Sequence, residues 1–167
     1  MTILNPDSAN YPNESEAAET ITAEQKIVEK VYSKRKPTKF PMPSGSFHMI
    51  VVDIRGYLDQ GGNEWDWRQM AYGAPGCWPE AAGAIQWWQG RPICGLFEQD
   101  NPIVGAQHVR QRIHMLGFVQ ERSFVPGEIH RTAHYCPNPH LFASQREAEA
   151  AFISYPLRRM VADGRHA

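Results

Sequence analysis

Apolar runs of strand length recur along the chain from residue 47 onward, and glycine, proline or polar residues bound each of them. The run "FHMIVVDI" over residues 47–54 has the length and the β-branched content of a buried strand. "RPICGLFE" over 91–98 predicts a second strand, and "FVQERSF" followed by "IHRTAHYC" predicts two more around a Pro-Gly turn. The first two runs each bring a carboxylate to their carboxyl end, Asp53 and Glu98.

Other segments have the three-to-four-residue spacing of a helix with one buried face. Helices are predicted at residues 65–73, 79–90, 103–117 and 144–157. In the last of these, Ser144 is the predicted N-cap and Glu147 completes a capping box. The order of the elements predicts an α/β or α+β fold, as a single domain with a mixed sheet and flanking helices.

The first 45 residues differ from the rest in charge and pattern. Residues 1–22 carry acids without bases and few large apolar side chains, which predicts a disordered acidic tail. Residues 23–45 predict a short basic amphipathic helix followed by a proline-rich linker. A globular α/β domain is then expected over residues 46–160, with a flexible C-terminus at 161–167.

Composition limits the class of protein further. The 167 residues include 42% hydrophobic residues, enough for a packed core, and the net charge of −1 argues against strong non-specific binding to nucleic acid. No apolar run reaches the length of a membrane span, so a soluble cytoplasmic protein is expected. The three widely spaced cysteines, Cys77, Cys94 and Cys136, predict free thiols rather than a disulfide framework.

The two strand-end carboxylates are the leading candidates for chemistry. In open α/β sheets, ligands bind beyond the carboxyl ends of strands, where Asp53 and Glu98 are predicted to lie. Together they would coordinate Mg²⁺. Arg55 and Arg68 would bind a phosphate of the substrate, and His114 would act as general base. This arrangement predicts a metal-dependent nucleic-acid phosphodiesterase, that is, a nuclease-like hydrolase. A turn-fixing ion pair between Asp53 and either arginine explains the same residues without catalysis.

Two nuclease folds share this outline. The strand "MIVVDIRG" resembles the first strand of the RNase H-like fold, in which an aspartate precedes a glycine turn, and "LFEQDN" resembles a later acidic strand of that fold. Residues 56–90, however, predict loop and helix where the RNase H-like fold has strands. The restriction-endonuclease-like fold places a lysine two residues after its second acid, where this chain has Asp100.

A second hypothesis is a divergent acyltransferase. The segment "HMLGFVQERSF", with Asn101 and Pro102 upstream, is similar to the helix-to-strand segment of GNAT acetyltransferases, and "VVDIRG" is similar to the entry to their coenzyme A loop. The resemblance implies that backbone amides at a helix start hold a pyrophosphate. The loop "RGYLDQGG" lacks that family's spacing of arginine or glutamine and two glycines. A helix C-cap and core role for Leu116, Gly117 and Phe118 explains the segment more simply.

Aromatic residues crowd into one stretch alongside arginines. They are Trp65, Trp67, Tyr72, Trp78, Trp87 and Trp88, with Arg68 and Arg91. Rings interleaved with arginine stack on bases or form the centre of a protein interface. In the nuclease hypothesis Trp65, Trp67 and Arg91 therefore join the two phosphate-gripping arginines in substrate binding. A third hypothesis is a non-catalytic module of a larger complex that binds protein or nucleic acid. Core packing accounts for several of the rings, but at least one tryptophan is expected to be exposed.

Histidines and a cysteine alternate along one predicted strand. His130, His134 and Cys136 would share a face of that strand, and His140 follows it. Imidazole and thiolate groups are ligands for zinc, so a metal site is one interpretation. Polar outward positions are the simpler one, because prolines break the strand after the cysteine and leave the four side chains poorly placed to converge.

Overall fold

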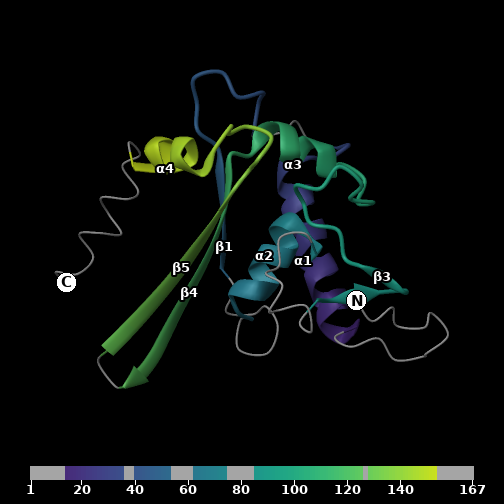
Figure 1. Cartoon of the computed structure of the whole chain (residues 1–167), viewed down its shortest axis with the longest axis vertical. Helices are drawn as coiled ribbons and strands as arrows, with labels where there is room; N and C mark the ends of the chain where they lie inside the picture. Colours follow the sequence, from purple (N-terminus) through teal and green to yellow (C-terminus); the bar gives the residue numbers. More distant parts are fainter. Residues whose placement is uncertain (1–13, 36–39, 54–61, 75–84, 126–127, 154–167) are drawn as a thin grey trace.

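A long hairpin of β4 (Met115–Val125) and β5 (Glu128–Pro137), with β1 (Met49–Asp53) along one side, forms the central sheet (Figure 1). The computed structural model of the protein describes residues 14–35, 40–53, 62–74, 85–125 and 128–153. The other elements in these ranges are α1 (Glu14–Val31), α2 (Glu64–Tyr72), β2 (Trp87–Trp88), β3 (Arg91–Pro92), α3 (Ala106–Arg112) and α4 (Gln145–Ile153). Together they form a single α+β domain, as predicted.

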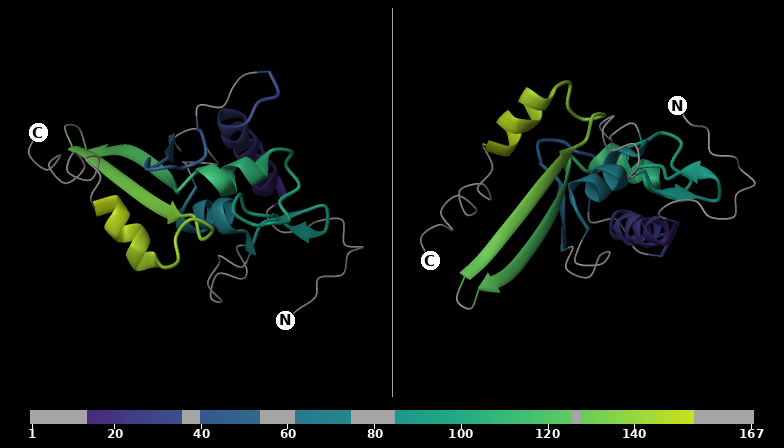
Figure 2. Two further views of the ribbon diagram at one scale, coloured as in Figure 1. Left: turned by 90° about the horizontal axis from the view of Figure 1, so that it is seen from above. Right: turned by 60° about the horizontal axis from the view of Figure 1, so that its bottom comes forward.

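The three-stranded sheet is mixed, which confirms the sequence-based prediction. β1 runs parallel to β4, with Val51 opposite Gly117, and β4 runs antiparallel to β5, with Phe118 opposite His134. β2 and β3 form a separate two-stranded ribbon. Figure 2 shows the far end of the hairpin projecting away from α1, α2 and α3, so these three helices cover only the part of the sheet near the start of β4.

One face of this sheet packs on the helices. Phe118 is fully buried, and the ring of Trp67 on α2 stacks on it with 6.1 Å between ring centroids. Ile50 and Val52 of β1 pack against the same core. Because side chains alternate along a strand, Val51 points to the other face of the sheet, and it is 53% exposed there.

The first helix is longer than the sequence pattern indicates. α1 begins at Glu14, so the prediction of a disordered tail through residue 22 is wrong for residues 14–22, and the helix predicted from residue 23 starts earlier. Its buried side chains recur every three or four residues along its whole length. They are Ala17, Thr20, Glu24, Ile27, Val28 and Val31. Thr20 and Glu24 are polar, so the first half of the buried face does not show the apolar spacing by which a helix is predicted from sequence.

Two predictions for the middle of the chain are corrected. The helix predicted over 79–90 is wrong in its described part, because Trp87–Trp88 is a strand and the chain then turns into β3. Residues 79–84 lie outside the described residues. The strand predicted over 91–98 is confined to Arg91–Pro92.

The apolar run after β3 covers the end of α2 instead of joining a sheet. The amide of Leu96 donates to the carbonyl of Met70 at 2.8 Å, and the amide of Phe97 donates to the carbonyl of Ala71 at 2.9 Å. The last carbonyls of a helix receive no hydrogen bond from an amide of the same helix, so they are available to a neighbouring segment. Burial of the run is therefore predicted correctly from the sequence, but its partner is a helix end.

The remaining helices differ in how closely they match their predictions. The helix predicted over 103–117 is limited to α3, since Ile113 is extended and the amide of His114 bonds to the carbonyl of His48 as the chain enters β4. The segment 116–118 is thus strand rather than a helix C-cap. The predicted N-cap of α4 is present, since Ser144 Oγ accepts from the amide of Glu147 at 3.2 Å. The predicted capping box is not closed on Ser144, because Oε2 of Glu147 accepts from the amide of Ala143 at 2.7 Å. None of the described helices is long and apolar enough to span a membrane.

Candidate functional site

Asp53 lies at the carboxyl end of β1, as predicted, but on the face of the sheet opposite to the one that packs on α2. It pairs with Val119 of β4. Its neighbour Val52 packs into the core, so alternation places the exposed Asp53 side chain on the opposite face. Arg55, the nearest predicted phosphate ligand, lies outside the described residues.

Glu98 lies at the other end of β1. Its Oε2 atom accepts a hydrogen bond from the amide of Gly95 at 2.7 Å in the turn that covers the end of α2. The carbonyl of the preceding residue, Phe97, is 2.6 Å from Nε2 of His140, just beyond the end of β5. That end of β5 is level with Met49, and a strand rises ~3.3 Å per residue, so Asp53 lies about 13 Å further along the sheet.

The predicted catalytic residues are therefore not brought together. Asp53 and Glu98 lie at opposite ends of β1 and on different sides of the sheet. His114 precedes β4 and lies near the start of β1, where its Nδ1 atom accepts from the amide of His48 at 3.0 Å and its ring stacks on Phe47. Burial lowers the pKa of His114. Within the described ranges, no group of three or more His, Cys, Asp or Glu side chains is placed to hold a metal ion.

The predicted histidine and cysteine cluster is also dispersed. His134 and Cys136 share a face of β5, but His134 Nδ1 lies 3.7 Å from Oε1 of Glu64 on α2, whereas Cys136 is buried. Burial raises the pKa of the Cys136 thiol to about 12, so it is not a thiolate at neutral pH. His140 contacts the segment after β3, and the side chain of His130 is outside the described side chains.

The aromatic stretch divides between the core and the surface. Trp67 is buried in the core, and Trp65 and Trp87 are half-buried. Trp88 is 37% exposed, which confirms the expectation of an exposed tryptophan. The guanidinium carbon of Arg68 lies 5.8 Å from the centre of the Tyr72 ring, and Arg91 is exposed on β3. Among the described members of this stretch, Trp88 and Arg91 line a cavity, whereas Trp78 lies outside the described residues.

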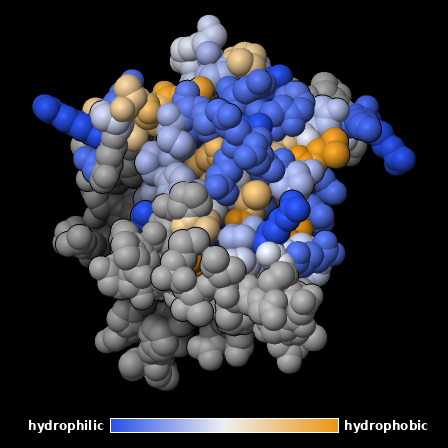
Figure 3. Space-filling view, turned by 45° about the vertical axis from the view of Figure 1, so that its right-hand side comes forward, coloured by the Kyte–Doolittle hydropathy of each residue, from blue (hydrophilic) through white to orange (hydrophobic). Residues whose placement is uncertain are grey.

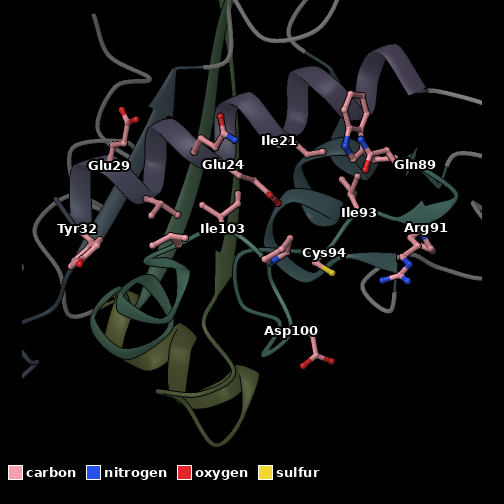
Figure 4. Close-up of a pocket in the computed structure, with 16 residues that line it drawn as sticks. Ile21, Glu24, Glu29, Tyr32, Gln89, Arg91, Ile93, Cys94, Asp100 and Ile103 are labelled. Atoms are coloured by element: carbon pink, nitrogen blue, oxygen red, sulfur yellow. The ribbon is translucent and has the colours of Figure 1, made fainter. Parts of the chain in front are cut away.

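The cavity, of about 880 Å³, lies between α1 and the chain that runs from β2 to residue 104 (Figure 4). Its wall on the α1 side includes Ile21 and Glu24. Ile93 and Ile103 line it from the opposite segment. The cavity therefore has an apolar interior with one buried carboxyl group, that of Glu24, in its wall.

Glu24 is the unusual residue of this wall. The side chain is 1% exposed, and its Oε1 atom is buried with no hydrogen-bond partner among the described residues. Burial raises the pKa of Glu24 well above its ordinary value, a hydrogen bond from the Asn101 side chain opposes this, and the negative charge of Glu98 adds to it. A buried carboxyl with an unused acceptor is costly, because water can no longer solvate it.

Asn101 fixes the segment that faces Glu24. Its Nδ2 atom donates to the carbonyls of Cys94 and Gly95 at 3.0 and 3.1 Å, and its Oδ1 atom accepts from the amide of Ile103 at 2.9 Å. These bonds tie both ends of the turn to one side chain. The cavity wall opposite α1 is thus held by a local network.

Glu24 was not among the candidate residues that the sequence suggests. It lies in α1, near the boundary between the predicted tail and the predicted helix, and a glutamate in a helix with many exposed charges gives no sign of burial. The signal that does exist is its position: it falls in the three-to-four-residue repeat that joins Ala17 to Val31.

No protein-family model, curated protein or solved structure matches this chain. Sequence and fold relatives thus supply no assignment for the cavity. Its chemistry rests on the side chains that line it.

Proposed function

We propose that this domain binds a small organic ligand in the cavity beneath α1. The observation that carries the proposal is the Oε1 atom of Glu24, which is buried in the cavity wall without a hydrogen-bond partner among the described residues. Folded proteins satisfy nearly all buried polar groups, so an unsatisfied carboxyl oxygen in a cavity wall calls for a partner. A ligand that donates a hydrogen bond to this oxygen would complete the pairing.

The size and composition of the cavity support a small ligand. Its volume of about 880 Å³ falls within the ~300–1,000 Å³ typical of ligand pockets, which are mostly apolar with a few polar groups that orient the ligand. Ile21, Ile93 and Ile103 supply apolar contacts, and Trp88 supplies an exposed ring at the margin. The turn held by Asn101 gives the wall a fixed shape before a ligand binds.

A broad protein interface on this side of the molecule has less support. On the face drawn in Figure 3, the coloured surface is mostly hydrophilic and its hydrophobic residues form small separate patches. Protein interfaces are centred on a contiguous buried patch, typically with aromatic anchors. The features on this face favour a confined pocket.

The metal-dependent phosphodiesterase stays a prediction with weaker support, because Asp53 and Glu98 lie at opposite ends of β1. The acyltransferase likewise stays a prediction: β1 and β4 pair without interruption from Met49 to Asp53, and this continuous pairing leaves no splayed strand pair there for coenzyme A.

A fragment screen by ligand-observed NMR tests the proposed function. The fragments would have one aromatic or aliphatic body and a positive, neutral or negative group. We expect fragments to bind the wild-type protein and the Met42→Trp control, which enlarges an exposed residue outside the cavity, and to lose binding in Ile103→Trp, which fills the cavity. Trp88→Ala, at the exposed margin, is the second variant in case Ile103→Trp does not fold. The proposal would be overturned if no positive, neutral or negative fragment bound the wild-type protein, or if neither cavity variant changed the binding.

A further inference from the structure

We infer that the ligand carries a cationic nitrogen, either an ammonium or an amidinium group, on an apolar body, and that the carboxylate of Glu24 is its counter-ion. This inference rests on the proposed function and specifies the chemistry of the same cavity. It concerns a free small molecule, because the cavity is of small-molecule size.

The ionisable side chains of the cavity wall favour a positive ligand. Glu24, Glu29 and Asp100 are acidic, and Arg91 is the basic member of the same lining. Glu98 lies outside the lining but is close enough for its charge to act on Glu24. An anionic ligand would meet this excess of carboxylates, whereas a cation would be attracted by it.

The position of Glu24 makes it the side chain that selects the charge of the ligand. Figure 4 shows its side chain leaving α1 toward the segment that carries Ile93 and Cys94. The Oε1 atom of this carboxyl is buried without a hydrogen-bond partner among the described residues, so it is left as an acceptor. An ammonium or amidinium N–H is the donor that pairs best with an acceptor of this kind, because a charge-assisted bond is about twice as strong as a neutral one.

The rest of the cavity suits the apolar part of such a ligand. Ile21 on α1 and Ile93 and Ile103 on the opposite segment provide apolar walls on both sides of Glu24. The Trp88 ring lies at the margin, where an aromatic face contacts apolar groups and attracts cations. A small molecule with a flat or branched apolar body and one cationic end would therefore use both features.

Isothermal titration with three probes of equal size tests this inference. The probes are benzamidinium, neutral benzamide and anionic benzoate, each titrated into wild-type protein, Glu24→Gln and Glu29→Gln. Glu29 is the matched control, since it lies on the same helix and lines the same cavity but is exposed. We expect wild type to bind benzamidinium at least about tenfold more tightly than benzamide, and Glu24→Gln to reduce this preference to about twofold. Glu29→Gln should retain it.

A second readout follows the proton on Glu24. Because the cation requires the ionised carboxyl, binding should strengthen as pH rises from 5 to 8 and should release a proton, measured in buffers of different ionisation enthalpy. The other titratable or charged groups around the cavity are Glu29, Tyr32, Arg91, Cys94, Glu98 and Asp100, and His108 stacks on Tyr32. Loss of the proton release in Glu24→Gln, but not in Glu29→Gln, would assign it to Glu24.

Other outcomes separate the two proposals. Cavity binding of benzamide or benzoate as tight as that of benzamidinium would overturn the cationic ligand while leaving the binding function intact. If none of the three probes binds and the fragment screen also detects no binding, both the binding function and the cationic ligand are overturned. Binding of a short arginine-containing peptide in the absence of benzamidinium binding would place the cation on a partner protein and overturn the small-molecule inference. If Glu24→Gln does not fold, absence of proton release in the wild type overturns the counter-ion role.

Discussion

The hydroxyl of Thr20 on α1 donates a 2.6 Å hydrogen bond to Oε1 of Gln86, 66 residues along the chain, and both side chains are buried. The backbone amide of Gln86 in turn donates to Oε1 of Gln69 at 2.7 Å, and the side-chain nitrogen of Gln86 donates to Oδ1 of Asp66 at 2.9 Å. This chain of buried bonds links α1 and α2 to the residue that precedes β2. It therefore fixes two of the segments between which the cavity forms.

The first prediction concerns this link. Thr20→Val keeps the shape of the side chain but removes the donor, so Oε1 of Gln86 loses its buried partner. We expect the free energy of unfolding to fall by about 1–3 kcal/mol, the usual cost of an unsatisfied buried acceptor. Urea unfolding measures this. Thr22→Val is the matched control, because the Thr22 hydroxyl bonds to the carbonyl of Ala18 at an exposed site, and a similar loss there would contradict the prediction.

The second prediction is that Glu24 lowers the stability of the domain as pH rises. Its pKa is raised in the folded state, so its favourable contribution is fully present below the unfolded value near 4.5 and is lost as pH rises toward the folded value. Glu24→Gln cannot ionise. We therefore expect Glu24→Gln to be more stable than wild type by about 1–3 kcal/mol at pH 8, with a smaller difference at pH 5.

Chemical unfolding at several pH values checks this prediction. Glu29→Gln, on the exposed side of the same helix, should show a small difference from wild type that does not grow with pH. A constant difference for Glu24→Gln across this range would show that the carboxyl ionises in the folded protein as easily as in the unfolded chain. Such a result would also weaken the case for Glu24 as a costly functional group.

The third prediction concerns the close approach of two backbone segments at the end of α2. A Cβ atom at Gly95 would lie 2.2 Å from the Gly73 nitrogen and 2.5 Å from backbone atoms of Tyr72. Gly95→Ala would push the segment off the helix end, and we expect a loss of at least about 3 kcal/mol, the upper range for overpacking. The control is Gly45→Ala, where φ is +73° but no atom lies within 4 Å. It should lose only the ~1–2 kcal/mol of left-handed strain.

Some elements of the fold carry their signal within their own stretch of sequence, and others depend on distant partners. β1, β4, β5, α2 and α4 could be predicted because each has its own periodicity or cap, and Asn63 even accepts from the amide of Trp65 as α2 begins. The helix predicted over 103–117 is borne out only for Ala106–Arg112, and the elements between residues 85 and 98 could not be predicted. There, Leu96 and Phe97 bond to a helix end, and this choice of partner leaves no periodic trace in the run itself.

The candidate site was harder to predict for a related reason. Asp53 and Glu98 both follow apolar runs, and the pattern alone treats both runs as strands of one sheet with a shared edge. Only the packing of residues 93–97 on α2 separates the two acids. Glu24, by contrast, is marked by burial, which depends on distant residues such as Asn101 and so is invisible in a local window.

The last prediction applies this geometry to Mg²⁺. If two carboxylates formed one site, Asp53→Ala and Glu98→Ala would each abolish the same binding event. Their placement at opposite ends of β1 predicts instead that any Mg²⁺ binding responds differently to the two substitutions, and that the double variant shows the sum of the single effects. Titration of Mg²⁺ and Mn²⁺ with non-cleavable DNA or RNA present measures this, because substrate phosphates can complete a magnesium shell. Complete loss in both single variants would restore the phosphodiesterase hypothesis and require β1 and the Glu98 turn to approach each other in solution.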